Sequence, residues 1–214
     1  MQTDRNSSGA VQLALGTISF AICFAAWGLI SAFAPRFRDL FHLSATQTAF
    51  LVAVPVVLGA LLRVVTGMLA DHFGGRIIFA ALMLVVAIPA YTVPTVGNYR
   101  NLIVVAFLLG IAGSSFAVGV GFVSRWFPPE SQGGALGIYG LGNIGQSAAV
   151  FLGPVQAGVV GWQNIFRGTA ALLVAWGLIF LLLARNSAKN DRLECPSHQG
   201  FLQQRSWQHA NSTK

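Results

Sequence analysis

Arg63 is the one charged residue deep inside the long apolar segments of this sequence. It precedes Asp71, where its segment ends, by eight residues, which on a helix is about 12 Å and therefore near the midplane of a bilayer. A guanidinium group keeps its proton there, and inserting it costs at least about 2.5 kcal/mol. All six acidic residues lie outside the apolar segments, so none can pair with it inside the membrane. The position predicts a site for a small anion. The alternative is a structural ion pair or a side chain that extends to the membrane surface.

The helical neighbours of Arg63 indicate which way it faces. Residues three and four positions away share its face of a helix, and they are small, whereas the opposite face is aliphatic. Small residues let a second helix approach closely, so we expect Arg63 to face protein and the aliphatic residues to face lipid. The small neighbours are Gly59, Ala60, Thr66 and Gly67, and the aliphatic residues are Leu58, Leu61, Leu62, Val65 and Leu69.

A second group of polar residues surrounds Asn143. Tyr139, Gln146 and Ser147 stand three or four positions from it, so on a continuous helix they form one polar stripe. The segment is also rich in glycine, which by itself predicts only tight packing between helices. Packing does not explain the concentration of polar side chains. We therefore predict that this stripe lines the same pathway as Arg63.

Two further patterns lie nearby. The run GLGNIG at 140–145 fits G-x-G-x-x-G, but it lies inside an apolar segment, no strand precedes it, and no acidic residue follows about 20 positions later. A dinucleotide site is therefore excluded. Gly113, Ala117 and Gly121 are spaced four apart, which is typical of a helix–helix interface, and Phe116 lies between them. No cofactor and no metal are predicted.

Six apolar segments must position these residues. Only 9% of the 214 residues are charged, against roughly 25% in a soluble domain. Each segment has the ~20 residues that a transmembrane helix needs and is too long for a membrane strand. The predicted fold class is an all-α membrane protein with six transmembrane helices. The segments are Val11–Ala34, Thr46–Ala70, Ile77–Gly97, Leu102–Phe127, Gly133–Val160 and Ile165–Ala184.

The rest of the chain flanks this bundle, residues 11–184. Residues 1–10 form a short N-terminal segment, and composition predicts a disordered polar tail at 185–214. The first apolar segment is about twice as long as the apolar region of a signal peptide, so we expect it to stay as a helix. With both termini on one side, that side carries eight Lys or Arg against four on the other. This favours cytoplasmic termini, although five of the eight lie in the tail.

Charge and cysteine content exclude other classes of protein. The net charge of +7 does not indicate nucleic-acid binding, because the basic residues are scattered over loops and the tail. Two cysteines, Cys23 and Cys195, do not make a disulfide framework. An intramembrane protease would need His or Asp within the bilayer, and the apolar segments contain neither.

Two stretches resemble a known family. The run GMLADHFGGR at 67–76 resembles the loop motif between helices 2 and 3 of the major facilitator superfamily, with Gly67, Asp71, Gly74 and Arg76 at matching positions. Residues 110–147, which include GSSF at 113–116 and GLGNIG at 140–145, are similar to the signature of the nitrate/nitrite porters. Arg63 matches their anion-binding arginine. The resemblance runs from about Val11 to Asn186.

This resemblance implies transport of nitrate or nitrite in the plasma (inner) membrane by a protein that is not an enzyme. The loop motif is cytoplasmic in the family, which implies cytoplasmic termini. The implied substrate-binding residues are Arg63, Phe116, Tyr139, Gly142 and Asn143. Family members have twelve helices in two halves, with the substrate between them. We therefore expect a half-length porter that acts with a second six-helix half or by self-association; the alternative is an inactive truncated fragment or a membrane scaffold.

Overall fold

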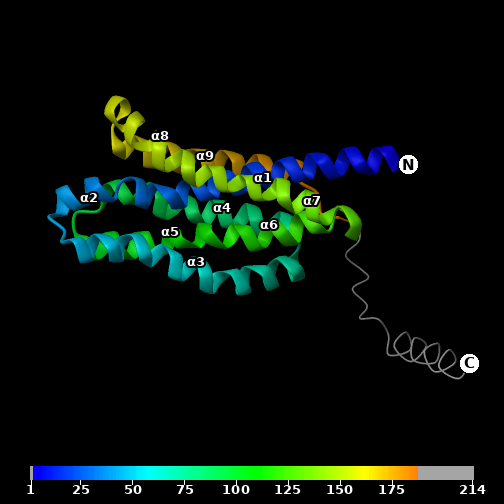
Figure 1. Cartoon of the computed structure of the whole chain (residues 1–214), viewed down its shortest axis with the longest axis horizontal. Coiled ribbons are helices and arrows are strands. Elements are labelled where there is room, and N and C mark those ends of the chain that lie inside the picture. Colours follow the sequence, from blue (N-terminus) through cyan, green and yellow to red (C-terminus); the bar gives the residue numbers. More distant parts are fainter. Residues whose placement is uncertain (1, 188–214) are drawn as a thin grey trace, which may run out of the picture.

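The computed structural model describes residues 2–187, which form a bundle of long helices (Figure 1). Six stretches of it are long and apolar enough to cross a membrane: Ser8–Ala32, Ala45–Phe73, Gly75–Thr95, Tyr99–Ser124, Pro129–Val160 and Trp162–Leu183. The predicted fold class is confirmed, and the predicted segments end within about four residues of these. The predicted tail falls almost entirely outside the described residues.

The spans differ in how continuous they are. The first is α1 (Gln2–Ala32), which already includes the described part of the predicted N-terminal segment, and the short α2 (Ala34–Phe41) follows it. The second and third are α3 (Ala45–Phe73) and α4 (Gly75–Thr92), the latter extended by η1 (Val93–Thr95). The fourth consists of α5 (Tyr99–Leu109), η2 (Gly110–Ser114) and α6 (Ser115–Ser124). The fifth consists of α7 (Pro129–Gly140), η3 (Leu141–Asn143) and α8 (Ile144–Val160), and the sixth is α9 (Trp162–Leu183).

Local sequence explains where several helices begin and end. Ser44 and Gln47 form a capping box at the start of α3, each side chain accepting from the other's backbone N–H. Pro129 opens α7, where a missing N–H costs nothing. Gly74 and Gly161 connect consecutive spans with φ of +89° and +84°, a conformation that favours glycine.

The core of the bundle lies around α1, which packs against α6, α7, α8 and α9 (Figure 1). In the apolar part of this span 61% of the residues are buried, against 17% for the second span. The second span, α3, packs against η2, α5 and α6 but leaves most of its circumference uncovered. The anion-site candidate therefore sits on the least buried helix of the described bundle.

Polar side chains join the two ends of the described chain within this core. The Trp176 indole Nε1 donates to the Ser19 hydroxyl at 2.9 Å, and the backbone N–H of Arg185 donates to the Gln12 side chain at 3.0 Å. The start of α1 and the end of α9 lie at the same end of the bundle (Figure 1). The described part of the chain therefore begins and ends at the same end of the bundle.

Candidate functional site

Arg63 is positioned by a close crossing of two backbones, at Gly59 of α3 and Gly113 of η2. A Cβ at Gly59 would lie 2.9 Å from the Gly110 carbonyl oxygen and 3.3 Å from the Gly113 Cα. A Cβ at Gly110 would overlap the Pro55 carbonyl. Because only glycines fit, α3 runs directly against η2, and Arg63, one helical turn after Gly59, lies beside Gly113.

Within the described part of the chain, the Arg63 side chain makes one hydrogen bond. Its Nε donates to the Gly113 carbonyl oxygen at 3.3 Å, and its guanidinium carbon lies 5.9 Å from the centroid of the Phe116 ring. That separation is within the range of a cation–π interaction. No acidic side chain and no further acceptor of residues 2–187 contacts the guanidinium. The two terminal nitrogens are therefore available to a ligand.

The predicted orientation of Arg63 is confirmed only in part, because its side chain contacts η2 but is not covered by protein. Arg63 is exposed, although Gly59 on the same face is buried. Leu61 and Val65 are exposed as well, with 65% and 44% of their surface accessible. The reason is that α3 contacts its neighbours along a narrow strip, so both faces of the helix next to that strip remain open.

An aromatic cluster supports Phe116 from behind. The Phe20 ring lies 5.5 Å from Phe116 and 4.9 Å from Tyr139, and the second pair is stacked. Tyr139 is fully buried, and its hydroxyl donates to the Ser115 carbonyl oxygen at 3.0 Å. Through this cluster α1 and α7 fix the position of the ring beside Arg63.

The predicted polar stripe does not form a single face. Tyr139 is buried in the cluster, whereas Asn143 and Ser147 are exposed. The interruption at η3 explains the difference. A 3₁₀ turn advances about 120° per residue and an α-helix about 100°, so three such residues rotate the following helix by roughly 60°. The Asn143 side chain makes no hydrogen bond to the described residues, so none joins it to Arg63.

Gly142 also lies behind the exposed surface. It is buried, and a Cβ there would overlap the Phe20 ring. Three residues later, a Cβ at Gly145 would overlap the Ala21 carbonyl. These glycines hold the fifth span against α1. The structure thus brings together Arg63 and Phe116 at an open surface, and it places Tyr139 and Gly142 in the packing that supports them.

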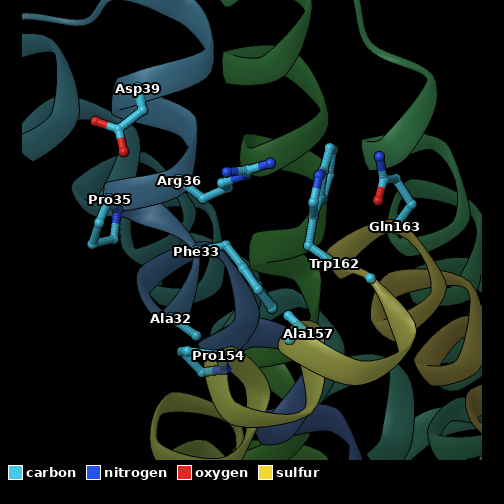
Figure 2. A pocket seen from close by; sticks show the side chains of 11 residues that line it. Ala32, Phe33, Pro35, Arg36, Asp39, Pro154, Ala157, Trp162 and Gln163 are labelled. Carbon is cyan, nitrogen blue, oxygen red and sulfur yellow. The ribbon is translucent and has the colours of Figure 1, made fainter.

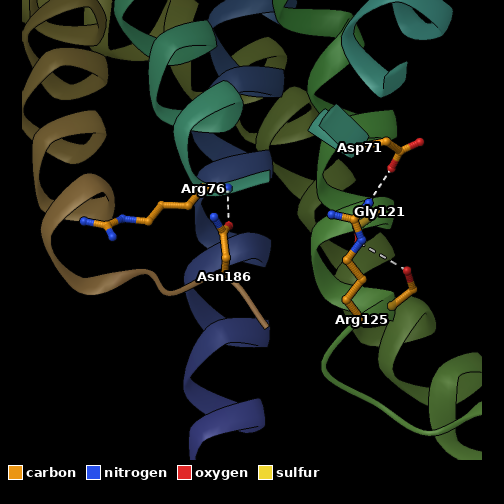
Figure 3. Close-up of polar contacts among 6 residues, drawn as sticks. Asp71, Arg76, Gly121, Arg125 and Asn186 are labelled. Carbon is orange, nitrogen blue, oxygen red and sulfur yellow. Dashed lines mark hydrogen bonds and ion pairs between the residues drawn. The ribbon is translucent and has the colours of Figure 1, made fainter. Parts of the chain in front are cut away.

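The residues of the loop motif form a second polar cluster at the end of the bundle (Figure 3). The Arg125 Nη2 donates to the Asp71 carboxylate at 2.6 Å, which is an ion pair between the second and fourth spans. The Arg76 guanidinium donates to the Leu181 carbonyl oxygen, with 2.9 Å from its Nε. The Arg76 backbone N–H donates to the Asn186 side chain at 3.1 Å. The motif therefore ties the α3–α4 loop to both α6 and the end of α9.

A separate cavity of about 550 Å³ opens at the opposite end of the bundle, between α2 and the α8–α9 turn. Figure 2 shows Arg36 extending toward Trp162, whereas Asp39 points away. Arg63 does not line this cavity. Among the described residues no group of three or more His, Cys, Asp or Glu side chains is placed to hold a metal ion.

Comparison with known proteins accounts for this architecture. Residues 15–211 match the profile of the Major Facilitator Superfamily. The chain belongs to this superfamily. The match extends past Asn186, where the sequence resemblance was expected to end. Among solved structures, a bacterial homologue of the human lysosomal transporter Spinster, in an inward-facing and unoccupied conformation, shares this fold with a TM-score of 0.73 at 18% identity. The alignment covers 85% of this chain and 44% of that one.

Curated relatives within the superfamily are named as nitrate carriers. The chain is 39% identical over 177 residues to a probable nitrate/nitrite antiporter, NarK1, of Thermus thermophilus, which covers 77% of this chain and 40% of the relative. It is 34% identical over 176 residues to a probable nitrate transporter, NarT, of Staphylococcus aureus, which covers 82% of this chain and 45% of the relative. The chain spans less than half the length of these relatives. Their names, and superfamily membership, confirm the expectation that the chain is not an enzyme.

Several residues that shape the site of this superfamily member were not singled out from the sequence. Asp71 was assigned to the motif, but Arg125, its partner 54 residues later, was not recognised. Gly59 was noted only as a small neighbour, yet with Gly113 it sets the distance between α3 and η2. The sequence feature that indicated this helix contact was the four-residue spacing of Gly113, Ala117 and Gly121. In the structure Gly113 and Gly121 both face α3.

Proposed function

We propose that this chain acts as one half of a nitrate/nitrite porter in the plasma membrane, with both termini cytoplasmic, and that Arg63 binds the anion. The relatives named above supply the substrate class. The observation that carries the assignment is the geometry of Arg63. Its Nε is held by the Gly113 carbonyl, which orients the guanidinium plane and leaves its two terminal nitrogens free to donate.

A planar oxyanion suits this arrangement. Two parallel N–H groups of a guanidinium can meet two oxygens of a planar anion, a geometry that lysine lacks. Phe116, exposed over 38% of its surface beside Arg63, provides a flat apolar wall. Tyr139 and Gly142 serve this site by fixing Phe116 and α1, while Asn143 is a substrate contact from the fifth span.

The exposure of Arg63 is the reason for proposing a partner. An arginine at the bilayer midplane that faces lipid costs at least about 2.5 kcal/mol, so a protein surface must cover this face of α3. Alternating access in secondary transporters comes from one repeat moving against another around a midplane site. A second six-helix half or a second copy of the chain supplies that surface.

The transport cycle that fits these residues is exchange of nitrate for nitrite. Proton coupling usually requires Asp, Glu or His within the membrane. The acidic and histidine residues of the described spans stand in their first or last turns, such as Asp71, His72 and Glu130. Arg63 stays positively charged, so a returning anion neutralises it as the departing one did.

Equilibrium binding of nitrate to the purified chain tests the site. Arg63→Ala should weaken binding by roughly 10- to 150-fold, the equivalent of a hydrogen bond to a charged group at about 1.5–3 kcal/mol. Arg63→Lys should recover little of it. Arg100→Ala, which removes another exposed arginine outside the site, is the matched control and should bind as the unaltered chain does.

Two results would contradict the proposal. Unchanged nitrate binding by Arg63→Ala would show that Arg63 is not the anion-binding residue. Absence of nitrate binding both by the unaltered chain and by the chain co-purified with a second half would favour the alternative, an inactive fragment or a scaffold without transport activity.

A further inference from the structure

A groove of about 710 Å³ runs along the outside of the bundle between α4 and α9. The residues that line it follow helical spacing, so each helix contributes one face. Ala87 and Ala170 form its buried floor, exposed over 5% and 4% of their surfaces, and Ile88 and Leu178 form exposed walls. The lining residues are Leu84, Ala87, Ile88, Tyr91 and Thr92 of α4, and Arg167, Ala170, Ala171, Val174, Ala175 and Leu178 of α9.

The groove is about as long as one leaflet of hydrocarbon is thick. Arg167 follows the first residue of α9, Trp162, by five residues, which is about 8 Å along the helix. A long basic side chain can extend from that depth toward the membrane surface. From Arg167 to Leu178 the groove extends about 16 Å, and the hydrocarbon of one leaflet is half of ~30 Å. On α9 the groove therefore begins below the membrane surface and continues past the midplane.

Among the described residues that form this apolar lining, Arg167 is the one that is charged. It is exposed, and its side chain makes no hydrogen bond or ion pair with the described residues. Tyr91, 57% exposed on the opposite wall, stands at the same end of the groove, where aromatic residues favour the membrane–water interface. The groove thus has an apolar length and a cationic end.

We propose that this groove is a binding site for a phospholipid with a net-negative headgroup, taken from the leaflet at the α2 end of the bundle. One acyl chain lies over the alanines of α9, and the phosphate accepts hydrogen bonds from Arg167. A guanidinium is well suited to a phosphate.

The lining also predicts selectivity among lipids. A zwitterionic phospholipid carries an ammonium group next to its phosphate, and no acidic side chain of residues 2–187 lines the groove to receive it. Arg167 would repel that ammonium. A headgroup without a positive charge, such as that of phosphatidylglycerol, avoids this electrostatic repulsion.

The test is native mass spectrometry of the purified full chain titrated with phosphatidylglycerol or with phosphatidylethanolamine. The unaltered chain should bind phosphatidylglycerol more tightly. Arg167→Gln should weaken phosphatidylglycerol by about fivefold, the attraction of one basic side chain for an anionic lipid, and should leave phosphatidylethanolamine nearly unchanged. Arg167→Lys should keep the preference, because the charge remains.

Two further variants separate the site from a general effect of charge. Arg100→Gln removes an exposed arginine outside the groove and should not alter lipid binding. Ala171→Trp fills the groove from an exposed position and should weaken both lipids. Equal binding of the two lipids by the unaltered chain, or equal losses in Arg167→Gln and Arg100→Gln, would overturn the proposal. The result does not depend on whether Arg63 binds nitrate.

Discussion

Replacing Gly59 by alanine should separate α3 from the interrupted fourth span. The added Cβ would lie 2.9 Å from the Gly110 carbonyl oxygen and 3.3 Å from the Gly113 Cα, and neither backbone atom can rotate away. Overpacking of this kind costs about 1–3 kcal/mol, against the ~1 kcal/mol that alanine gains over glycine in a helix. We therefore expect a net loss of up to about 2 kcal/mol in the free energy of unfolding.

The same shift should affect Arg63. The distance of 3.3 Å from its Nε to the Gly113 carbonyl oxygen is already slightly beyond the usual range of an N–H···O hydrogen bond. Moving α3 outward by a few tenths of an ångström breaks this bond, because the donor–acceptor distance then exceeds that of an N–H···O hydrogen bond. Gly59→Ala should therefore weaken nitrate binding as well as stability, without touching the guanidinium.

Thermal unfolding in detergent, followed by tryptophan fluorescence, measures the first effect. For a domain of this size 1 kcal/mol shifts Tm by about 2–4 °C, so Gly59→Ala should melt up to roughly 8 °C lower. Gly137→Ala is the matched control, since no atom of another described residue lies within 4 Å of the added Cβ, and its Tm should be equal or higher. A Gly59→Ala protein as stable as Gly137→Ala would show that α3 and η2 do not approach as closely as described.

Four further results are expected. Asp71→Asn should lower the free energy of unfolding by at most ~1 kcal/mol despite the 2.6 Å ion pair with Arg125, because 68% of the Asp71 side chain is exposed; a larger loss in chemical denaturation would refute this. A cysteine at Asn143 should react with a water-soluble thiol reagent in the purified chain, whereas one at the buried Tyr139 should not, and equal labelling would contradict the rotation at η3. Monomers of the chain in liposomes should take up no nitrate, and uptake by verified monomers would refute the need for a partner. Vesicles that pair the chain with a second half lacking membrane carboxylates and histidines should exchange anions between pH 6 and 8 without proton flux. A proton flux stoichiometric with nitrate would refute the absence of proton coupling.

The six spans were predictable because a bilayer demands ~20 apolar residues per crossing, and a long run of such residues has few other interpretations. Arg63 was singled out as a candidate site for the same reason, since a charge in hydrocarbon needs an explanation. Both inferences depend only on the hydrocarbon of the bilayer, which surrounds every residue of an apolar segment in the same way.

The interruptions at η2 and η3 were not predictable, because they depend on partners distant in sequence. A regular helix is the default for an apolar run, so Tyr139 and Asn143 were expected on one face. The backbone of η2 instead lies directly against α3 at Gly59, and Gly142 in η3 and Gly145 just after it pack against Phe20 and Ala21 of α1. The helical spacing of residues in the sequence describes one helix at a time. It contains no information on where the backbone of another helix contacts that helix.

The polar contacts of α1 have a consequence for the order in which the chain assembles. Gln12 and Ser19 lie in the first span, but their partners, the backbone of Arg185 and the indole of Trp176, are synthesised 173 and 157 residues later. If spans enter the membrane in the order of synthesis, four further spans insert after α1 and before α9. Throughout this time the Gln12 side-chain amide lacks its partner, the backbone of Arg185. Polar groups in hydrocarbon are costly until they are paired. The first helix to be made is thus the last to be completed, and a nascent chain arrested before Trp162 should present an unfinished α1 to the machinery that inserts or degrades membrane proteins.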